Sequence, residues 1–257
     1  MLRPRIIPCL LIQDSGLVKT TKFKEPKYVG DPINAVRIFN EKEADELVVL
    51  DIDATALGLE PNYQRIAHLA AECRMPLCYG GGIKTVEQAR KIIELGVEKV
   101  ALSFMAIESP STLKAIADEI GQQSVVVVLD VKKKLMSKTY EVWTHNASKN
   151  TKKNVIDVIK DMQVNGAGEI VINFIEHDGT MKGYPIDFIK SIKSNVHVPF
   201  TLLGGAGSLN DLGDLVAACG IVGASAGSLF VFKGKYRAVL INYPTQQQKK
   251  DTVYSRL

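Results

Sequence analysis

Short apolar runs rich in Val, Ile and Leu alternate along the chain with segments of helical hydrophobic spacing. The runs are nearly continuous, as in strands buried on both faces of a parallel sheet. Helices are predicted after Asp31-Pro32, over residues 85–94, and from Pro110 after a capping Ser109. The pattern predicts eight strands, over residues 5–12, 46–53, 76–79, 99–103, 124–131, 169–173, 199–203 and 221–225. Eight such units in 257 residues predict an α/β fold, the (β/α)8 TIM barrel of about 250 residues.

The chain also contains one internal repeat. Residues 47–53 (LVVLDID) match residues 170–176 (IVINFIE), and Gly81-Gly82 matches Gly204-Gly205 at the same offset of 123 residues. Two half-barrels of four units explain the repeat, so loop chemistry in one half is expected in the other. We predict one barrel domain over residues 1–243 and a short polar tail over residues 244–257.

Composition limits the function classes. A chain with 46% apolar and 23% charged residues is too apolar to be disordered. The net charge of +4 is too small and dispersed to predict a nucleic-acid or membrane partner. The four cysteines lack metal-ligand spacing, so we expect reduced thiols, no metal, no cofactor and a cytoplasmic location. Residues 215–232 carry no charge, but glycines interrupt them, which favours a helix end, a strand and a loop over a membrane span.

Glycines cluster after three predicted strands, where this fold places its functional loops. Gly81 and Gly82 follow the third strand, Gly204 and Gly205 the seventh, and Gly227-Ser228 the eighth. Glycine lets backbone N–H groups approach an anion closely, which favours phosphate binding over a purely structural turn. The repeat would suit a substrate with a phosphate at each end.

Acidic residues end several predicted strands: Asp51, Asp53, Asp130, Glu176 and Asp178. Asp130 closes the apolar run VVVVLD, where a charge is costly unless it faces a polar mouth. A general acid/base role for Asp130 is favoured over a structural ion pair. For Asp178-Gly179-Thr180, a turn that caps a helix and a ligand grip stay equally open.

Two polar stretches follow the first and fifth strands. Residues 13–30 carry four lysines and are either a lid over an anionic substrate or a solvated loop. Residues 132–153 are basic, which usually indicates a solvated face. His145 lies in this second stretch, and a structural role is favoured over one in the site.

Four charged residues stand at the N-terminal starts of predicted strands: Arg5, Glu46, Lys99 and Glu169. Two cations and two anions at one end of the barrel must pair to offset their desolvation. They form either a salt-bridge plug or a gate that admits a small neutral molecule through the barrel.

Colinear motifs run through most of the chain: RIIPCL, Lys19, DELVVLDI, GGGI, VVVVLDVK, GAGEI, HDGT, GGAG and AGS. Together they resemble the cyclase subunit of imidazole glycerol phosphate synthase. The resemblance implies a glutaminase partner at the N-terminal face of the barrel. It also implies that ammonia crosses the barrel to a bis-phosphorylated ribulosyl substrate, giving imidazole glycerol phosphate and an aminoimidazole carboxamide ribotide.

The resemblance assigns roles by position. The gate residues are Arg5, Glu46, Lys99 and Glu169, and Asp130 matches one of two catalytic aspartates. The substrate and phosphate residues are Lys19, Gly81, Gly82, Ser103, Asp178, Gly179, Gly204, Gly205, Gly227 and Ser228.

Three positions depart from the family pattern. Leu11 stands where the family has its other catalytic aspartate, and such a loss costs about 10²–10⁴-fold in rate. Ser103-Phe104 replaces a common Asn-Thr, and Asn173-Phe174 replaces a common Thr-Ser, so both phenylalanines are expected to crowd the site.

An intact gate beside a changed mouth, with the opening PCLL at residues 8–11 and the ending LINYP at residues 240–244, resembles the family branch associated with acetamidino sugars of bacterial surface polysaccharides, such as O-antigen. Our leading hypothesis is an ammonia-conducting subunit that acts with a glutaminase and a sugar amidotransferase. One rival is a histidine-pathway cyclase in which Asp53 or Asp51 assists Asp130. A phosphosugar isomerase of the same ancestry is weaker, because an isomerase has no ammonia to admit. Whether the chain is itself a catalyst stays open.

Overall fold

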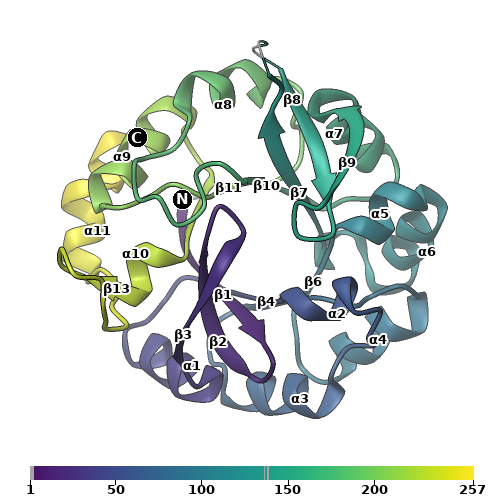
Figure 1. The fold of residues 1–257 in the computed structure, drawn as a ribbon, viewed down its shortest axis with the longest axis horizontal. Coiled ribbons are helices and arrows are strands. Elements are labelled where there is room, and N and C mark those ends of the chain that lie inside the picture. The colour runs from purple at the N-terminus through teal and green to yellow at the C-terminus, as the bar shows by residue number, and fades with distance from the viewer. Residues whose placement is uncertain (1–2, 136, 138) are drawn as a thin grey trace.

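The computed structural model describes residues 3–135, 137 and 139–257. Eight parallel strands pair in chain order, and the last pairs with the first, so the sheet closes into a barrel (Figure 1). All eight predicted strands and the (β/α)8 fold are confirmed. The barrel strands are β1 (Arg5–Gln13), β4 (Leu47–Asp51), β5 (Leu77–Gly80), β6 (Lys99–Leu102), β7 (Val125–Lys133), β10 (Glu169–Phe174), β11 (Phe200–Leu203) and β12 (Gly223–Ala226).

Helices surround the barrel (Figure 1). The outer helices are α1 (Pro32–Glu41), α3 (Tyr63–Glu72), α4 (Val86–Glu94), α6 (Pro110–Ile120), α7 (Val155–Val164), α8 (Ile186–Lys193) and α9 (Leu209–Cys219). Asp31 caps α1 by accepting the N–H of Asn34, and Thr85 forms a capping box at α4. Ser109 precedes α6 as predicted, but its side chain caps no backbone N–H and bonds Thr112 Oγ1 at 2.8 Å instead.

The apolar residues form two separate groups. One lies between strands and helices, and the other fills the barrel interior with side chains that include Cys78, Val126 and Val171. Successive residues of a strand point to opposite faces, so seven of the eight barrel strands contribute to both groups, whereas β12 contributes only to the outer one. This explains why the runs in the sequence are continuous and do not alternate.

Two β-hairpins extend from the C-terminal ends of barrel strands (Figure 1). They are β2 (Gly16–Thr21) with β3 (Lys24–Gly30), and β8 (Tyr140–Thr144) with β9 (Lys149–Asn154). The sequence predicted a loop over residues 13–30, which is wrong because β2 pairs antiparallel with β1. In the second stretch, β8 pairs antiparallel with β7 in the same way. Lys138, one of the basic residues of the second stretch, lies outside the described residues.

Short elements complete the barrel mouth and the C-terminus. They are α2 (Ile52–Ala56), α5 (Phe104–Glu108), η1 (Gln122–Ser124), α10 (Ser228–Val231), β13 (Phe232–Lys233), β14 (Ala238–Val239), α11 (Gln246–Thr252) and η2 (Tyr254–Arg256). The uncharged stretch 215–232 comprises the end of α9, β12 and α10. In the described part of the chain, no helix is long and apolar enough to cross a membrane.

The segment predicted as a polar tail folds onto the barrel as α11. Lys249 is fully buried, and its Nζ lies 2.7 Å from Asp45 Oδ1. Asp45 Oδ2 also accepts the N–H of Ile6 at 2.9 Å. Tyr243 joins the same two segments, since its hydroxyl donates to Ile6 O at 2.8 Å and accepts the N–H of Asp45. The C-terminal segment thus binds residues that adjoin Arg5 and Glu46, two of the four charges predicted at the N-terminal end of the barrel.

Candidate functional site

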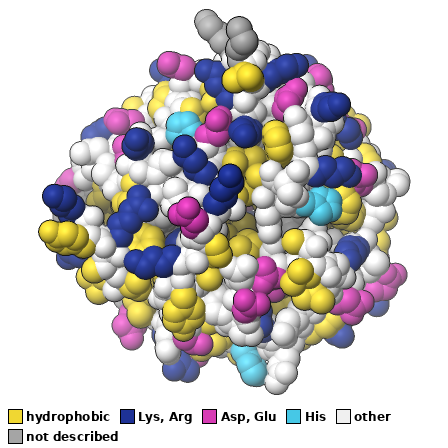
Figure 2. Space-filling model, in the orientation of Figure 1, with side chains coloured by type: hydrophobic (Ala, Val, Ile, Leu, Met, Phe, Trp, Pro, Cys, Tyr) yellow, Lys and Arg dark blue, Asp and Glu magenta, His cyan; other side chains and the backbone are white. Residues whose placement is uncertain are grey.

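The C-terminal ends of the strands open into a cavity of about 250 Å³. Figure 2 shows this face, with a hollow near its centre and apolar side chains at the wall. The cavity brings together all the mouth residues to which the family resemblance assigned a position: Leu11, Lys19, Gly81, Gly82, Ser103, Asp130, Asp178, Gly179, Gly204, Gly205, Gly227 and Ser228. Their predicted roles in binding and catalysis stay predictions.

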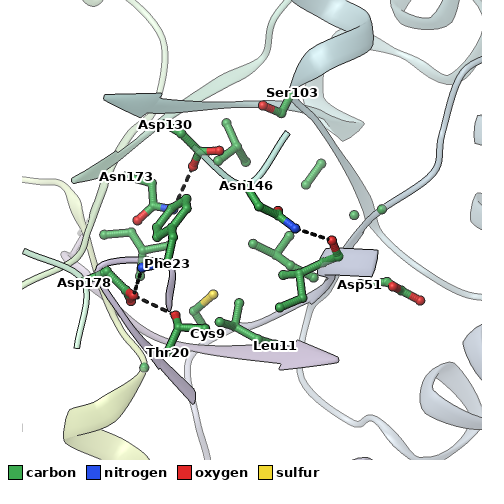
Figure 3. Close-up of a pocket in the computed structure, with 18 of the residues that line it drawn as sticks. Cys9, Leu11, Thr20, Phe23, Asp51, Ser103, Asp130, Asn146, Asn173 and Asp178 are labelled. Carbon is green, nitrogen blue, oxygen red and sulfur yellow. Dashed lines mark hydrogen bonds between the residues drawn. The ribbon is translucent and has the colours of Figure 1, made fainter. Parts of the chain in front are cut away.

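Asp130 points into the mouth from β7 (Figure 3). The side-chain amide of Asn173 on β10 donates to Asp130 Oδ1 at 2.8 Å. Burial raises the pKa of Asp130 to about 7, against the lowering effect of this hydrogen bond, and the charge of Asp178 raises it further. A carboxyl with this pKa can hold or release a proton near neutrality, as a general acid/base requires.

Leu11 lines the same cavity from β1 (Figure 3). Its side chain has no proton to exchange. Asp51 also lines the cavity, but its Oδ1 caps α2 by accepting the N–H groups of Asp53 and Ala54 at 3.1 Å each. Burial raises the pKa of Asp51, with the charge of Arg65 opposing. The carboxylate of Asp51 therefore serves as the N-cap of α2.

The other acidic candidates bond local backbone or side-chain donors. Asp53 accepts from Gln13 Nε2 at 3.1 Å and from the N–H of Asp14 at 3.0 Å. Glu176 accepts the N–H of Lys133 at 3.2 Å. Neither is among the residues that line the cavity. Asp130 is thus the mouth carboxyl best placed for proton transfer.

Asp178 holds the β2–β3 hairpin over the mouth (Figure 3). Its Oδ2 accepts from Thr20 Oγ1 at 2.7 Å and from the N–H of Phe23 at 3.0 Å. Its backbone carbonyl accepts the N–H of Lys22 at 3.0 Å. Lys22 and Phe23 form the hairpin turn with positive φ, +54° and +62°, and Phe23 lines the cavity. Asp178 therefore anchors the hairpin turn, whereas the sequence left open a turn that caps a helix and a ligand grip.

Lys19 belongs to β2 of this hairpin and is only 5% exposed. Its ammonium donates to the carbonyl of Cys9 and lies beside Gly227. Burial lowers the pKa of Lys19, while the neighbouring Asp178 charge raises it. Lys19 is therefore a buried cation inside the mouth, and of the four lysines in residues 13–30 it is the one that lines the cavity.

The two phenylalanines expected to crowd the mouth behave differently. Phe104 lines the cavity and packs against His145, with ring centroids 4.3 Å apart. Phe174 points into the helix layer, where its ring lies 6.2 Å from that of Phe188. The prediction for Phe174 is wrong because the preceding Asn173 takes the inward position on β10. His145 lines the cavity, contrary to the favoured structural interpretation.

The glycine motifs of the two halves adopt matching backbone conformations. Gly81 and Gly82 have φ of +126° and +73°, and Gly204 and Gly205 have φ of +98° and +122°. A Cβ on Gly81 would lie 2.5 Å from Asp51 O. Turn geometry alone therefore requires glycine here, so the glycines do not by themselves establish a phosphate site.

At the opposite, N-terminal end the four predicted charges form a closed ring, which we call the floor. Lys99 Nζ lies 2.8 Å from Glu46 Oε1 and 3.0 Å from Glu169 Oε2. Arg5 pairs with Glu46 and, at 2.8 Å, with Glu169. Burial raises the pKa of Glu169, but Arg5 and Lys99 together lower it to about 2. Glu169 is therefore ionised at neutral pH, and the ring is internally neutral.

A small cavity of about 10 Å³ lies inside the barrel between floor and mouth. A space of this size holds about one water-sized molecule. Glu46 and Glu169 form its lower wall, and it shares Leu50, Val128 and Leu203 with the mouth cavity. The barrel thus has a narrow, mostly apolar interior that connects the residues of the two ends.

Comparison with known proteins places the chain. A family model described as histidine biosynthesis protein matches residues 5–237. The chain belongs to this family.

Relatives of this histidine biosynthesis family member cover almost its whole length. A Vibrio vulnificus protein, provisionally named imidazole glycerol phosphate synthase subunit hisF3, is 58% identical over 97% of this chain and 96% of its own. A Leptospira borgpetersenii protein, provisionally named subunit HisF of the same synthase, is 56% identical over 97% of this chain and 98% of its own. The imidazole glycerol phosphate synthase subunit HisF of Hyphomonas neptunium is 36% identical over 90% of this chain and 91% of its own. The resemblance identified from the motifs is confirmed.

Three residues that shape the site in this family member were missed in the sequence. Thr201 Oγ1 donates to Glu169 Oε1 at 2.6 Å, so it belongs to the floor. A polar residue inside the apolar run FTLL was an available signal. Asn146 Nδ2 donates to Ile52 O at 2.7 Å and ties the β8–β9 loop across the mouth (Figure 3). Phe23 gave no signal, because the hairpin turn it occupies was expected to be an irregular loop.

Within the residues that the structure describes, no three His, Cys, Asp or Glu side chains lie together as metal ligands.

Proposed function

We propose that this chain receives ammonia from a glutaminase partner at the floor and conducts it through the barrel to the mouth. There the ammonia would be supplied, with a sugar amidotransferase, to acetamidino-sugar synthesis for surface polysaccharide. The observation that carries this proposal is Leu11, an apolar side chain at the predicted acid position, above an intact ring of four charges.

The floor and the interior support the conducting role. A neutral ring of paired charges leaves no net charge to attract an ion. The space above is sized for one small molecule and has mainly apolar walls. Ammonia is small and uncharged, so its transfer from water into such a passage costs little free energy compared with the transfer of an ion.

The mouth supports loss of the cyclisation step. Asp130 has the pKa of an acid/base, but Leu11 cannot be its partner. Asp51 and Asp53 are committed to local hydrogen bonds, so neither replaces the missing aspartate without breaking a cap or a turn. Relatives at 58% and 56% identity carry a provisional name, whereas identity to the Hyphomonas neptunium subunit is only 36%, which supports a separate branch.

The delivery test uses glutamine labelled with ¹⁵N at its amide. The complete chain is combined with a glutaminase subunit and a sugar amidotransferase, and label in the amidino product is measured by mass spectrometry. We expect labelled product that competing unlabelled ammonium does not dilute. Replacing Lys99 or Glu169 by alanine should abolish this protection, and unchanged protection in both variants would return the ring to a structural plug.

A histidine-pathway cyclase is the second candidate, because Asp130 has a pKa of about 7 and faces the same cavity as Lys19. In this case ammonium and the bis-phosphorylated ribulosyl substrate would suffice for turnover. Leu11→Asp sharpens the distinction. Cyclase activity that appears only in this variant would show that the rest of the mouth still fits the family substrate and that Leu11 removed the activity.

A further inference from the structure

The β13–β14 hairpin carries apolar side chains that the barrel does not cover. Tyr236 is 90% exposed, Leu240 is 49% exposed and Val239 is 45% exposed. The hairpin is nevertheless fixed to α10, because the N–H of Leu240 donates to Val231 O at 2.9 Å. Exposed apolar side chains that lie together on a fixed element are typical of a surface that binds another molecule.

Cations surround these apolar side chains. The β2–β3 hairpin adjoins the β13–β14 hairpin, since Lys27 Nζ lies 5.4 Å from the centre of the Phe232 ring. Figure 2 shows Lys and Arg side chains gathered with hydrophobic ones over β13, on the left of the face that holds the hollow. We define the basic patch as the three apolar side chains together with Lys22, Lys24, Lys27, Lys233, Lys235 and Arg237.

The charge of the basic patch is not balanced within the chain. Glu25 is the one acidic residue in segments 22–28 and 232–240. Among residues 3–135, 137 and 139–257, none of the six cations forms a salt bridge. In the β8–β9 hairpin, by contrast, Lys134 pairs with Glu141 at 3.4 Å and Lys149 pairs with Glu108 at 3.7 Å. The basic patch is therefore suited to a partner with an acidic face.

The basic patch continues to the rim of the mouth. Arg237 Nη2 donates to Gly179 O at 2.9 Å, and Gly179 lines the mouth cavity. Ser228 lines the cavity as well, and it begins α10, which leads directly into β13. A molecule that covers the patch therefore also reaches the opening of the barrel.

We propose that the basic patch docks the enzyme that consumes the ammonia, through an acidic face with an apolar centre, and so holds its active site over the mouth. This inference rests on the proposed function and adds to it the surface that binds the sugar amidotransferase. Ammonia takes up a proton in neutral water, so a docked enzyme receives it before that happens and a distant one does not. An anionic membrane on the same patch would lie against the mouth and leave no room for an acceptor enzyme.

The test measures binding of the complete chain to the amidotransferase by biolayer interferometry, without glutaminase or glutamine. We expect the two proteins to bind, and we expect the affinity to fall as salt is added, because salt screens exposed charges. Phosphatidylglycerol vesicles are the alternative surface. Binding to the vesicles and not to the amidotransferase would overturn the proposal, and so would binding to neither.

Charge reversal locates the surface. Lys233→Glu combined with Lys235→Glu should weaken the affinity for the amidotransferase by about tenfold or more, with most of the change in the association rate. Lys160→Glu combined with Lys190→Glu is the matched control, because both residues are exposed on the outer helices α7 and α8 and the change in net charge is the same. The control should bind within about twofold of wild type.

A second pair of variants tests the apolar part of the patch. Tyr236→Ser should weaken binding by about tenfold, as for an aromatic residue at the centre of an interface. Val164→Ser is the control, since Val164 is 83% exposed on α7. Thermal melting verifies that each variant folds. Unchanged affinity in both the charge-reversal and the Tyr236→Ser variants would show that the partner docks elsewhere.

This failure is distinguishable from failure of the proposed function. If the partner docks elsewhere, the delivery test still gives undiluted ¹⁵N in the amidino product. If instead the patch variants lose binding while the delivery test gives diluted label, the docking surface stands and conduction through the barrel is wrong.

Discussion

At the floor of the barrel, four charged side chains neutralise one another, whereas at the mouth the buried carboxyl of Asp130 has an amide as its partner. Every floor charge has at least two ionic contacts within the ring. Among the described residues, Asp130 accepts one side-chain hydrogen bond, from Asn173, and the ammonium of Lys19 donates one, to Cys9 O. The floor is satisfied without a ligand, while the mouth keeps donors and a proton available.

The difference separates two tasks within one barrel. Under the proposed function, a saturated floor would discriminate by size and charge, because any ion that enters must compete with existing pairs. An unsaturated mouth discriminates by hydrogen bonding and shape. Leu11 changes the chemistry of the mouth and makes no contact with the floor charges. Ammonia passage and cyclisation could therefore be lost independently of each other.

The largest expected effect comes from breaking the floor. Lys99→Met leaves two buried carboxylates with Arg5 alone, and we expect the free energy of unfolding to fall by about 3–5 kcal/mol. Urea denaturation measures it. Lys114→Met, which removes an exposed lysine paired with Asp118, is the matched control and should change little. A loss no larger than that of the control would show that the ring is not tightly coupled.

The pH dependence of the floor follows from Glu169. Its pKa is about 2 in the folded chain, against about 4.3 when unfolded, so its contribution is present above pH 5. About 3 kcal/mol should be lost as the pH falls from about 5 to 2. Glu169→Gln should be less stable at pH 7 and should show a flatter acid limb in denaturation curves. An acid limb identical to wild type would contradict the depressed pKa.

The clasp behind the floor should have an intermediate effect. Lys249→Met leaves Asp45 without its buried partner, although Ile6 N–H still bonds it, and we expect a loss of about 2–3 kcal/mol. The neighbouring Lys250 is exposed, so Lys250→Met is the control. Equal melting temperatures for the two variants would show that burial of Lys249 contributes nothing.

The mouth should respond to pH in the opposite direction. Because burial raises the pKa of Asp130 to about 7, folding takes up a proton between about pH 4 and pH 7, and stability falls as the pH rises through this window. Asp130→Asn removes the buried charge and should stabilise the chain at pH 8 by about 1–3 kcal/mol. Thermal denaturation at pH 5 and pH 8 measures this, and a variant less stable than wild type at pH 8 would contradict it.

The smallest expected effect concerns the hairpin over the mouth. Thr20→Val removes the hydroxyl that donates to Asp178, which costs about 1 kcal/mol of local stability. Hydrogen exchange over β2 and β3 should accelerate about fivefold, with the barrel strands unchanged. Thr21→Val is the adjacent control. If both variants exchange alike, the latch to Asp178 does not hold the hairpin.

Sequence predicted the parts of this molecule that depend on local rules. Hydrophobic runs located the eight strands, and the glycines of the repeat occupy backbone conformations that only glycine tolerates well. The floor charges were found because charge at the start of a buried strand is rare without a partner. Asp130 was found by the same argument at the strand end.

The rest depends on contacts between distant segments. Burial of Lys19 and Lys249 rests on Cys9 O and Asp45, which lysine-rich polar stretches do not reveal. The inward side of β10 was misassigned for Phe174 because facing depends on register, and a shift of one residue exchanges the two faces. His145 reaches the cavity only because the β8–β9 hairpin folds back over the mouth.

The central claim is that the chain conducts ammonia but has lost the cyclisation step at Leu11. The most direct test is turnover of the bis-phosphorylated ribulosyl substrate by the purified chain with saturating ammonium salt. Turnover is measured as the rate at which the aminoimidazole product appears. The account predicts no turnover above background for the wild-type chain. Robust wild-type turnover would contradict it.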